Sequence, residues 1–445
     1  MNHFFIQTLG CKVNQYESDA IAQMLISSGW IRTDAVSEAD ACILNTCAVT
    51  GRAGVQSRQA ARRLIRSAPQ AVIVITGCYT QIASPAISDI TGVHAIIDHR
   101  DKPRICEQVH TLSLLPPERR PQACALQRNH CDDTRFLPFP VVTDRARTRQ
   151  HLKIQDGCNA FCTYCIVPYT RGRSRSMAAD EVVSQVRGLA ASQCREVILA
   201  GIHLGMYGHD LHPPTDLAAI TRRMLSETNI PRIRFGSIEP AEVTDELLVL
   251  AENSPRICRH FHVPLQNGDD TLLKQMKRPY DFAFFSERIR EIHSRIPSAA
   301  IGIDVMVGFP GESDAAFERT RERIAGLPIS HLHVFPFSPR PGTPAAGFPD
   351  PVPGHTASGR ARLLRELGAE KTHAFATQAL SDGPLKVLFE KTLQPDGRIR
   401  GVSDHYLTVF APGDPGLKNR IVNVTGISVA ADGSITGRVT KGKCD

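Results

Sequence analysis

The chain has 445 residues, of which 42% are hydrophobic and 22% are charged, and this balance excludes a disordered polypeptide and indicates two to four folded domains. No apolar run reaches the roughly 18 residues of a membrane span, and the first residues lack a signal peptide, so we expect a cytoplasmic protein with no membrane partner. The net charge of +7 fits a nucleic-acid partner without establishing one, and thirteen cysteines indicate reduced thiols that bind metal or do chemistry.

Residues 1–110 contain three strand-like runs, each followed by a cysteine. Helix-like stretches separate these runs, and the alternation predicts a parallel sheet with crossover helices. The loops beyond the carboxyl ends of such strands converge on one crevice. We therefore expect the three thiols to meet in a three-thiolate site, the alternative being three separate buried cysteines. The thiols concerned are those of Cys11, Cys47 and Cys78.

A linker and a barrel are predicted next. Residues 111–147 are rich in proline and charge, which is typical of an interdomain connection. Residues 148–380 then alternate six strand-like with six helix-like runs and end in a further helix. Six βα repeats are fewer than the eight of a closed barrel, so the pattern predicts a partly open one with its reactive residues beyond the carboxyl ends of the strands.

A cysteine-rich loop follows the first strand of this predicted barrel. Cys158, Cys162 and Cys165 have the spacing C-x3-C-x2-C, one thiol short of a closed four-ligand site. Soft thiolates suit iron in a [4Fe–4S] cluster, and three of them would leave the fourth iron open to a further ligand. The alternatives are three unrelated core cysteines or a zinc site completed by a distant histidine.

Residues 381–445 show about five short strands separated by turns such as Pro395–Gly397 and Ala431–Gly433. This pattern predicts a small β-barrel or roll.

Several motifs together resemble one known family. The stretch from Ile154 to Pro168 looks like the radical S-adenosylmethionine (SAM) signature, and Tyr169–Ser176 narrows the resemblance to the methylthiotransferases. Thr8–Ser18, Asn45–Cys47 and Thr76–Gln81 resemble the amino-terminal domain of that family. The resemblance implies a flavodoxin-like parallel-sheet domain, a partial (β/α)6 radical SAM barrel and a TRAM-like carboxyl-terminal β-barrel that binds RNA.

The resemblance also implies cofactors and their ligands. Two [4Fe–4S] clusters are expected, one on Cys158, Cys162 and Cys165 and an auxiliary one on the three amino-terminal cysteines, together with SAM. Residues at the strand ends of the barrel are candidates to contact SAM, and they are Tyr164, Gly201, Ser237, Glu239 and Asp304. For Arg171, Arg173 and Arg175, which follow the cysteine loop, contact with tRNA and an internal salt-bridge role both stay open.

The sequence Lys12-Val13-Asn14, directly after Cys11, resembles the corresponding sequence of the family branch that acts on threonylcarbamoyl-adenosine in tRNA. The resemblance therefore implies methylthio transfer to carbon 2 of this base next to the anticodon, with tRNA, an electron donor such as flavodoxin or ferredoxin, and a sulfur source as partners. The alternatives are a methylthiotransferase for isopentenyladenosine or a ribosomal protein, and a non-catalytic, zinc-bearing RNA-binding protein.

Overall fold

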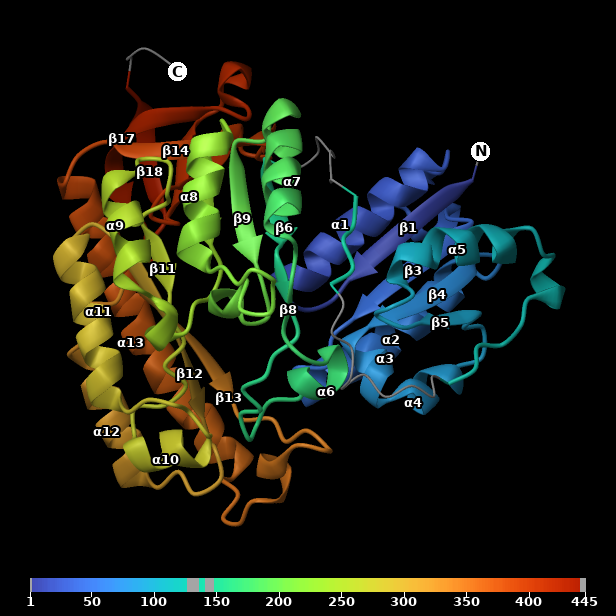
Figure 1. The fold of residues 1–445 in the computed structure, drawn as a ribbon, viewed down its shortest axis with the longest axis horizontal. Helices are drawn as coiled ribbons and strands as arrows, with labels where there is room; N and C mark the ends of the chain where they lie inside the picture. The colour runs from blue at the N-terminus through green and yellow to red at the C-terminus, as the bar shows by residue number, and fades with distance from the viewer. Residues whose placement is uncertain (1, 126–135, 141–147, 441–445) are drawn as a thin grey trace.

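The amino-terminal part of the computed structural model is a five-stranded parallel sheet with helices on both faces (Figure 1). The structure describes residues 2–125, 136–140 and 148–440, so much of the predicted linker lies outside the described residues. The strand order is β2-β1-β3-β4-β5, which is the flavodoxin-like order. The elements are β1 (His3–Thr8), α1 (Lys12–Ser27), β2 (Ile31–Arg32), β3 (Ala41–Thr46), α2 (Gly51–Ser67), β4 (Val72–Gly77), α3 (Cys78–Ile82), α4 (Ser84–Ser88), β5 (Ala95–Ile97) and α5 (Ile105–Ser113).

The middle of the chain forms six parallel strands in two three-stranded sheets, β6-β9-β10 and β11-β12-β13. Single bridges from Ile233 to Ile257 and from Ser237 to His262 join them into one curved wall, which confirms the partial barrel. The elements are β6 (Arg149–Lys153), β7 (Gln155–Asp156), α6 (Val167–Arg171), β8 (Arg175–Ser176), α7 (Ala179–Ala191), β9 (Glu196–Ala200), α8 (Leu217–Glu227), β10 (Arg232–Phe235), α9 (Asp245–Asn253), β11 (His260–His262), α10 (Asp270–Gln275), α11 (Phe282–Arg295), β12 (Ala300–Val307), α12 (Asp314–Ala325), β13 (His331–Pro336) and α13 (Gly354–Ser381).

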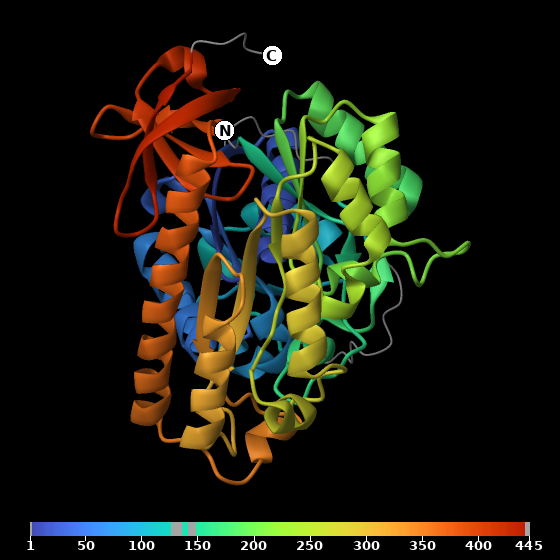
Figure 2. The same cartoon turned by 90° about the vertical axis from the view of Figure 1, so that its left-hand side faces the viewer.

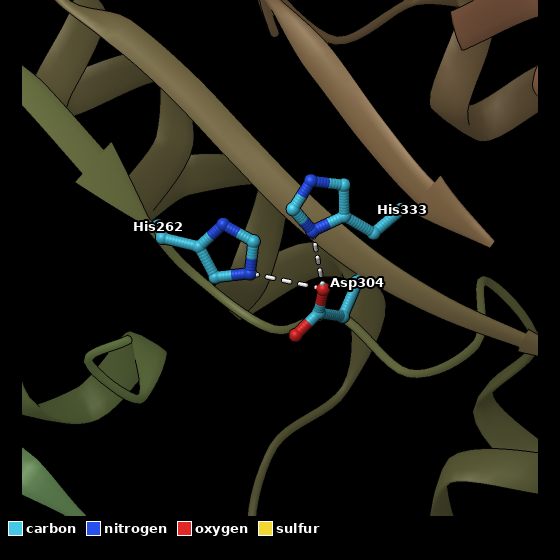
Figure 3. Close-up of side chains that lie close together, drawn as sticks. All are labelled: His262, Asp304 and His333. Carbon is cyan, nitrogen blue, oxygen red and sulfur yellow. Dashed lines mark hydrogen bonds and ion pairs between the residues drawn. The ribbon is translucent and has the colours of Figure 1, made fainter. Parts of the chain in front are cut away.

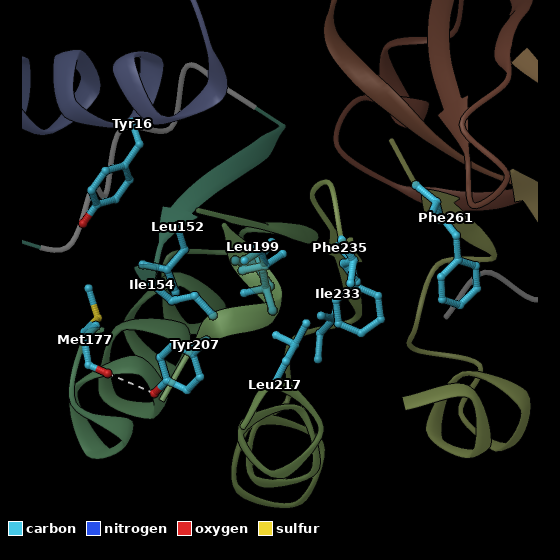
Figure 4. Close-up of a cluster of buried hydrophobic side chains, with 14 of the residues drawn as sticks. Tyr16, Leu152, Ile154, Met177, Leu199, Tyr207, Leu217, Ile233, Phe235 and Phe261 are labelled. Carbon is cyan, nitrogen blue, oxygen red and sulfur yellow. Dashed lines mark hydrogen bonds between the residues drawn. The ribbon is translucent and has the colours of Figure 1, made fainter. Parts of the chain in front are cut away.

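The amino-terminal domain contacts both open ends of this wall. Helix α1 packs against β6 at one edge. At the other edge, the Gly51 amide donates a hydrogen bond of 2.9 Å to Oγ of Ser338, just after β13. One apolar core runs from Tyr16 of α1 through the barrel strands to Phe261 (Figure 4). Strands β3 and β4 are buried throughout, as strands covered on both faces must be, and this explains their nearly continuous apolar sequences.

Helix α13 runs along the barrel and leads into a closed five-stranded barrel at the carboxyl-terminal end (Figure 2). This small barrel is consistent with the predicted TRAM-like module, while the exact domain limits stay a prediction. None of the helices in the described part of the chain combines the length and apolar character that crossing a bilayer requires. The five strands are β14 (Leu385–Leu393), β15 (Arg398–Ser403), β16 (Thr408–Pro412), β17 (Ile421–Val429) and β18 (Ile435–Val439).

Two arginines of β10 hold this small barrel against the larger one. Arg234 forms a two-pronged pair with Glu196 at 2.8 and 3.2 Å and also donates to the carbonyl oxygens of Ser403 and Asp404. Arg232 donates to the carbonyl of Lys386 at 2.9 Å. These guanidinium groups are buried, and buried donors need hydrogen-bond acceptors. The carbonyl oxygens of the small barrel supply some of these acceptors.

Candidate functional site

The three amino-terminal cysteines lie at the carboxyl ends of neighbouring strands. Cys11 follows β1, Cys47 follows β3, and Cys78 begins α3 directly after β4. Burial first, and the neighbouring Cys78 and Cys11 thiols in addition, raise the pKa of Cys47 to about 11. The structure thus brings these thiols together at the point of the sheet where strand order reverses, between β1 and β3.

Two glycines permit this meeting of loops. Gly77 has φ of 104°, and a Cβ atom placed on it would lie 2.3 Å from the carbonyl oxygen of Thr46. Gly10 has φ of 100°, and its added Cβ would lie 2.8 Å from Sγ of Cys47. Only glycine adopts this backbone conformation without strain and leaves space for such a close approach.

The second cysteine triplet lies in the loop between β7 and α6. Sγ of Cys158 lies 3.5 Å from Nδ1 of His203, and Arg278 Nη1 donates to Sγ of Cys162 at 3.3 Å. Burial, with the nearby Cys162 and Cys158 thiols adding to it, raises the pKa of Cys165 to about 12. The loop therefore groups the three thiols, with the buried side chain of Arg278 beside Cys162 and His203 beside Cys158.

The spacing within both triplets bears on the kind of metal that fits. Zinc–sulfur bonds of about 2.3 Å bring the thiolates of a tetrahedral site to within about 4 Å of one another. Across the described ranges, the only trio of cysteine, histidine or acidic ligand atoms that all lie within 4.8 Å belongs to His262, Asp304 and His333. In the described part of the chain, the thiols of neither triplet stand at the separations of a tetrahedral zinc site.

The charges around the thiols also suit an anionic cluster. Ligand thiols must lose their protons, and burial opposes this in both triplets until a metal binds the sulfur. Each triplet has a buried arginine beside it that favours the charged form. Burial raises the pKa of Cys78, and the Arg171 guanidinium acts against this rise. Arg278 acts in the same direction on Cys165.

The predicted SAM-contacting residues lie at the carboxyl ends of the barrel strands. Tyr164 and Asp304 line one cavity of about 270 Å³ together with Cys165, and Val49 and Thr50 of the amino-terminal domain complete its wall. The lining of this cavity therefore includes Val49, two residues after Cys47, and Cys165 from the cysteine loop of the barrel. Both cysteine-bearing domains contribute to its lining.

The other three predicted SAM-contacting residues lie outside the lining of this cavity. Glu239 forms a salt bridge with Arg278, the same arginine that donates to Cys162. Gly201 follows β9 and packs closely against Gln155, while Ser237 is exposed after β10. The roles of all five residues toward SAM stay predictions. Sequence reasoning missed Arg278, because it stands in a turn after α10 with no motif around it.

Asp304 has a histidine on either side (Figure 3). Its Oδ1 atom lies 3.0 Å from Nε2 of His262 and 3.2 Å from Nδ1 of His333. Burial opposes ionisation of this carboxyl group, but the two imidazoles outweigh burial and hold the pKa of Asp304 well below its ordinary value. Asp304 is therefore a charged group at the wall of the cavity that Cys165 also lines.

A buried ionic network joins the two cysteine-bearing domains. Glu17 of α1 pairs with Lys102 of its own domain and, across the domain boundary, with Lys153 at 3.0 Å and Arg171 at 2.9 Å. Asp156 in turn pairs with Lys153 and Arg171, both at 3.0 Å. The side chains of Glu17, Lys102 and Arg171 are each only 1% exposed.

This network decides between the two roles that the sequence left open for the arginine run. Arg171 is internal and also donates to Oδ1 of Asn14 at 2.6 Å. Arg175 is buried too and lies 3.4 Å from Asp156. Arg173 differs, because its guanidinium is exposed and stacks over the ring of Phe161 at 5.4 Å. An internal salt-bridge role is therefore correct for Arg171 and Arg175.

Comparison with known proteins gives the family of the chain. Residues 152–324 match the radical SAM superfamily, and residues 3–98 match a family described as uncharacterized protein family UPF0004. The chain is 36% identical to the threonylcarbamoyladenosine tRNA methylthiotransferase MtaB of Bacillus subtilis, and the match covers 94% of this chain and 92% of that relative. The chain belongs to the radical SAM methylthiotransferase family. Membership makes it an enzyme of the radical SAM transferase class, with SAM and a [4Fe–4S] cluster as cofactors.

Other relatives of this methylthiotransferase carry two different substrate names. A threonylcarbamoyladenosine tRNA methylthiotransferase of Aquifex aeolicus is 33% identical over 83% of the chain and 88% of the relative. A tRNA-2-methylthio-N(6)-dimethylallyladenosine synthase of Syntrophobacter fumaroxidans is also 33% identical, over 83% of the chain and 81% of the relative. The fold resembles that of the radical SAM methyltransferase TsrM of Kitasatospora setae, with a TM-score of 0.55 and 15% identity over 78% of this chain and 77% of that one.

Proposed function

We propose that this methylthiotransferase converts N6-threonylcarbamoyladenosine at position 37 of tRNA to its 2-methylthio derivative. The observation that carries the proposal is the pair of cysteine triplets, one in each of two domains that a buried ionic network joins and that line one cavity. The names of the relatives support the choice of base, since four relatives at 33–36% identity are called threonylcarbamoyladenosine tRNA methylthiotransferases.

We assign one [4Fe–4S] cluster to Cys158, Cys162 and Cys165, and a second to Cys11, Cys47 and Cys78. The C–H bond at carbon 2 of adenine is neither acidic nor open to a nucleophile, so side chains alone cannot activate it. When bound, the cofactors supply radical activation of this bond and the sulfur that replaces its hydrogen.

The side chains of the chain hold these groups and balance their charge. Arg278 faces the barrel triplet and Arg171 the amino-terminal one, and each offsets the negative charge that cluster-bound thiolates introduce. Tyr164, Gly201, Ser237, Glu239 and Asp304 are our candidates for contact with SAM. The cavity of about 270 Å³ between the domains is where a reactive intermediate would be held, and substrate bound over it would limit access of water and side reactions.

The proposal implies partners and a place of action. The substrate is tRNA, which the TRAM-like barrel of residues 381–445 would bind alongside the amino-terminal domain of residues 1–110 and the barrel of residues 148–380. An electron donor such as flavodoxin or ferredoxin and a sulfur source complete each turnover. A tRNA substrate and such donors fit a cytoplasmic enzyme.

Nucleoside analysis of tRNA tests the proposed substrate. Total tRNA from a strain lacking this protein is digested and compared by mass spectrometry with tRNA from the same strain carrying the gene. We expect the methylthio-threonylcarbamoyl nucleoside to disappear in the deletion strain and to return with the gene. If the methylthio derivative of the dimethylallyl nucleoside disappears instead, the alternative substrate is correct. Unchanged tRNA with loss of a ribosomal-protein modification contradicts both.

Iron content and SAM cleavage test the ligand assignment. Anaerobically reconstituted protein should hold about eight irons, as two four-iron clusters require. The triple variant Cys158→Ala, Cys162→Ala, Cys165→Ala should keep about four irons and lose SAM cleavage. The matched variant Cys11→Ala, Cys47→Ala, Cys78→Ala should keep SAM cleavage and lose methylthiolation. Cleavage by the first triple variant would contradict the assignment, and a colourless protein would favour the zinc alternative.

A further inference from the structure

A continuous row of aromatic rings lines the inner wall of the barrel. The ring of Tyr406, from the small carboxyl-terminal barrel, lies 4.7 Å from that of His260 on β11. His260 stacks on His331 of β13 at 5.6 Å, and His331 lies 5.9 Å from His262. The row ends at Asp304, which pairs with His262 at the cavity of the cysteine loop. The rings therefore connect the cysteine loop with the place where all three domains meet.

Two further cations, Lys12 and Arg149, lie at the Tyr406 end of this row. Nζ of Lys12 lies 6.0 Å and the guanidinium of Arg149 lies 5.9 Å from the centre of the Tyr406 ring. Among the described residues, no carboxylate oxygen lies within 4.0 Å of either cation. Arg234, 5.0 Å from the same ring, differs because Glu196 neutralises it.

Lys12 and Arg149 are both only half-buried, so they can still reach a ligand. The position of Nζ over the Tyr406 ring places the Lys12 side chain at the end of the row of rings. Arg149 and Tyr406 also line a cavity of about 330 Å³ between the two barrels. Two cations beside an aromatic ring, neither of them in an ion pair with a carboxylate of the described residues, suit an anionic ligand.

Lys12 directly follows Cys11, one of the cysteines that we assign to the amino-terminal cluster, and consecutive Cα atoms lie only about 3.8 Å apart. In adenine, carbon 2 and the carbon that carries N6 both flank N1, so a substituent on N6 lies on the same edge of the base as carbon 2. A base whose carbon 2 faces the Cys11 loop therefore presents its N6 substituent to the same region. The threonylcarbamoyl group ends in a carboxylate, whereas a dimethylallyl group carries no charge.

We propose that Lys12, together with Arg149 at the Tyr406 ring, binds the carboxylate of the threonylcarbamoyl group and so selects this base over an uncharged one. The inference rests on the proposed function, because it concerns the substrate of the same site. Lys12 is the main contact, since it stands beside Cys11, and Arg149 reinforces the positive charge from the barrel side.

Two substrates and three variants test this subsite. The substrates are anticodon stem-loops that carry threonylcarbamoyl-adenosine with its free carboxylate or with the carboxylate converted to a carboxamide. The measured quantity is the ratio of kcat/KM for the two, from mass spectrometry of the methylthio product. We expect the wild-type enzyme to prefer the carboxylate by about 10- to 100-fold, as a charged hydrogen bond provides. Lys12→Gln should lower this ratio to near one, and Lys12→Arg should preserve much of it.

The control is Lys418→Gln, which removes an exposed lysine of the small barrel. Because it weakens any general attraction to tRNA equally for both stem-loops, the ratio should stay at the wild-type value. Iron content of each variant checks that the neighbouring Cys11 site is intact. If Lys12→Gln lowers kcat/KM equally for both substrates, Lys12 contacts tRNA phosphate or supports the fold, and the inference is wrong. Product from neither stem-loop with wild-type enzyme would contradict the proposed function instead.

Discussion

Replacement of Glu17 by glutamine should weaken the joint between the two cysteine-bearing domains. Glu17 faces Lys102, Lys153 and Arg171 in a buried environment, and glutamine has the same shape without the charge. In Glu17→Gln, Lys153 and Arg171 keep Asp156 as a carboxylate partner. Lys102 is paired with Glu17 alone among the ion pairs described above, so it loses its partner.

The size of the effect follows from burial. Removing one partner of a buried ion pair typically costs about 3–5 kcal/mol, because it leaves an uncompensated charge without water. Domain stabilities are of the order of 5–15 kcal/mol, so this is a large fraction of the total. We therefore expect Glu17→Gln to lower the free energy of unfolding by about 3 kcal/mol or more.

Urea unfolding of the full chain, followed by circular dichroism, measures this loss. The control is Glu107→Gln, which breaks the exposed pair with Arg104 in the same domain and should cost no more than about 1 kcal/mol. The functional readout is methylthiolation per SAM cleaved, which should fall in Glu17→Gln because the amino-terminal cluster loses its fixed position relative to the barrel. Equal stability losses in the two variants would refute the reasoning.

Three further changes have defined outcomes. The pKa values of Glu17 and Asp156 in the folded state are held below their unfolded values of about 4. The stabilisation they give is therefore complete above pH of about 4, and the free energy of unfolding decreases as the pH is lowered further. This decrease should be less steep in Glu17→Gln, and denaturant unfolding at several pH values measures it. Gly77→Ala, whose Cβ collides with the Thr46 carbonyl, should lower the melting temperature far more than Gly29→Ala, which has positive φ but open space; equal effects would contradict the collision. Arg234→Met should cost about 3–5 kcal/mol and expose residues 382–384 to limited proteolysis, unlike Arg400→Gln in a pair that is only partly buried. Protease resistance of Arg234→Met would contradict the docking role of Arg234.

The sequence predicted the parts of the fold that depend on local pattern. The three strands that end at Cys11, Cys47 and Cys78, the open barrel and the five-stranded module follow from apolar runs and turns, and the fold confirms them. Strand β2 was missed because it has only two residues, both exposed, so no apolar run marks it. β5 has only three residues, too few for a clear pattern.

Contacts between distant residues could not be predicted in the same way. Arg171 stands in a basic run that suits tRNA as well as an internal carboxylate, and only the folded chain places Glu17 beside it. Arg278 has no motif, and its contacts with Cys162 and Glu239 arise from three separate loops. The meeting of Lys12 with Tyr406 joins opposite ends of the chain, which periodicity cannot reveal.

The ionic joint around Glu17 has a consequence for protein engineering. A chimaera that takes residues 1–110 from a relative inherits the acid and Lys102 from one parent but Lys153, Asp156 and Arg171 from the other. Such a hybrid will assemble only if both parents carry matching charges at these places. Exchange of substrate preference between family members by domain grafting should therefore succeed more often when these five residues are all taken from the same parent.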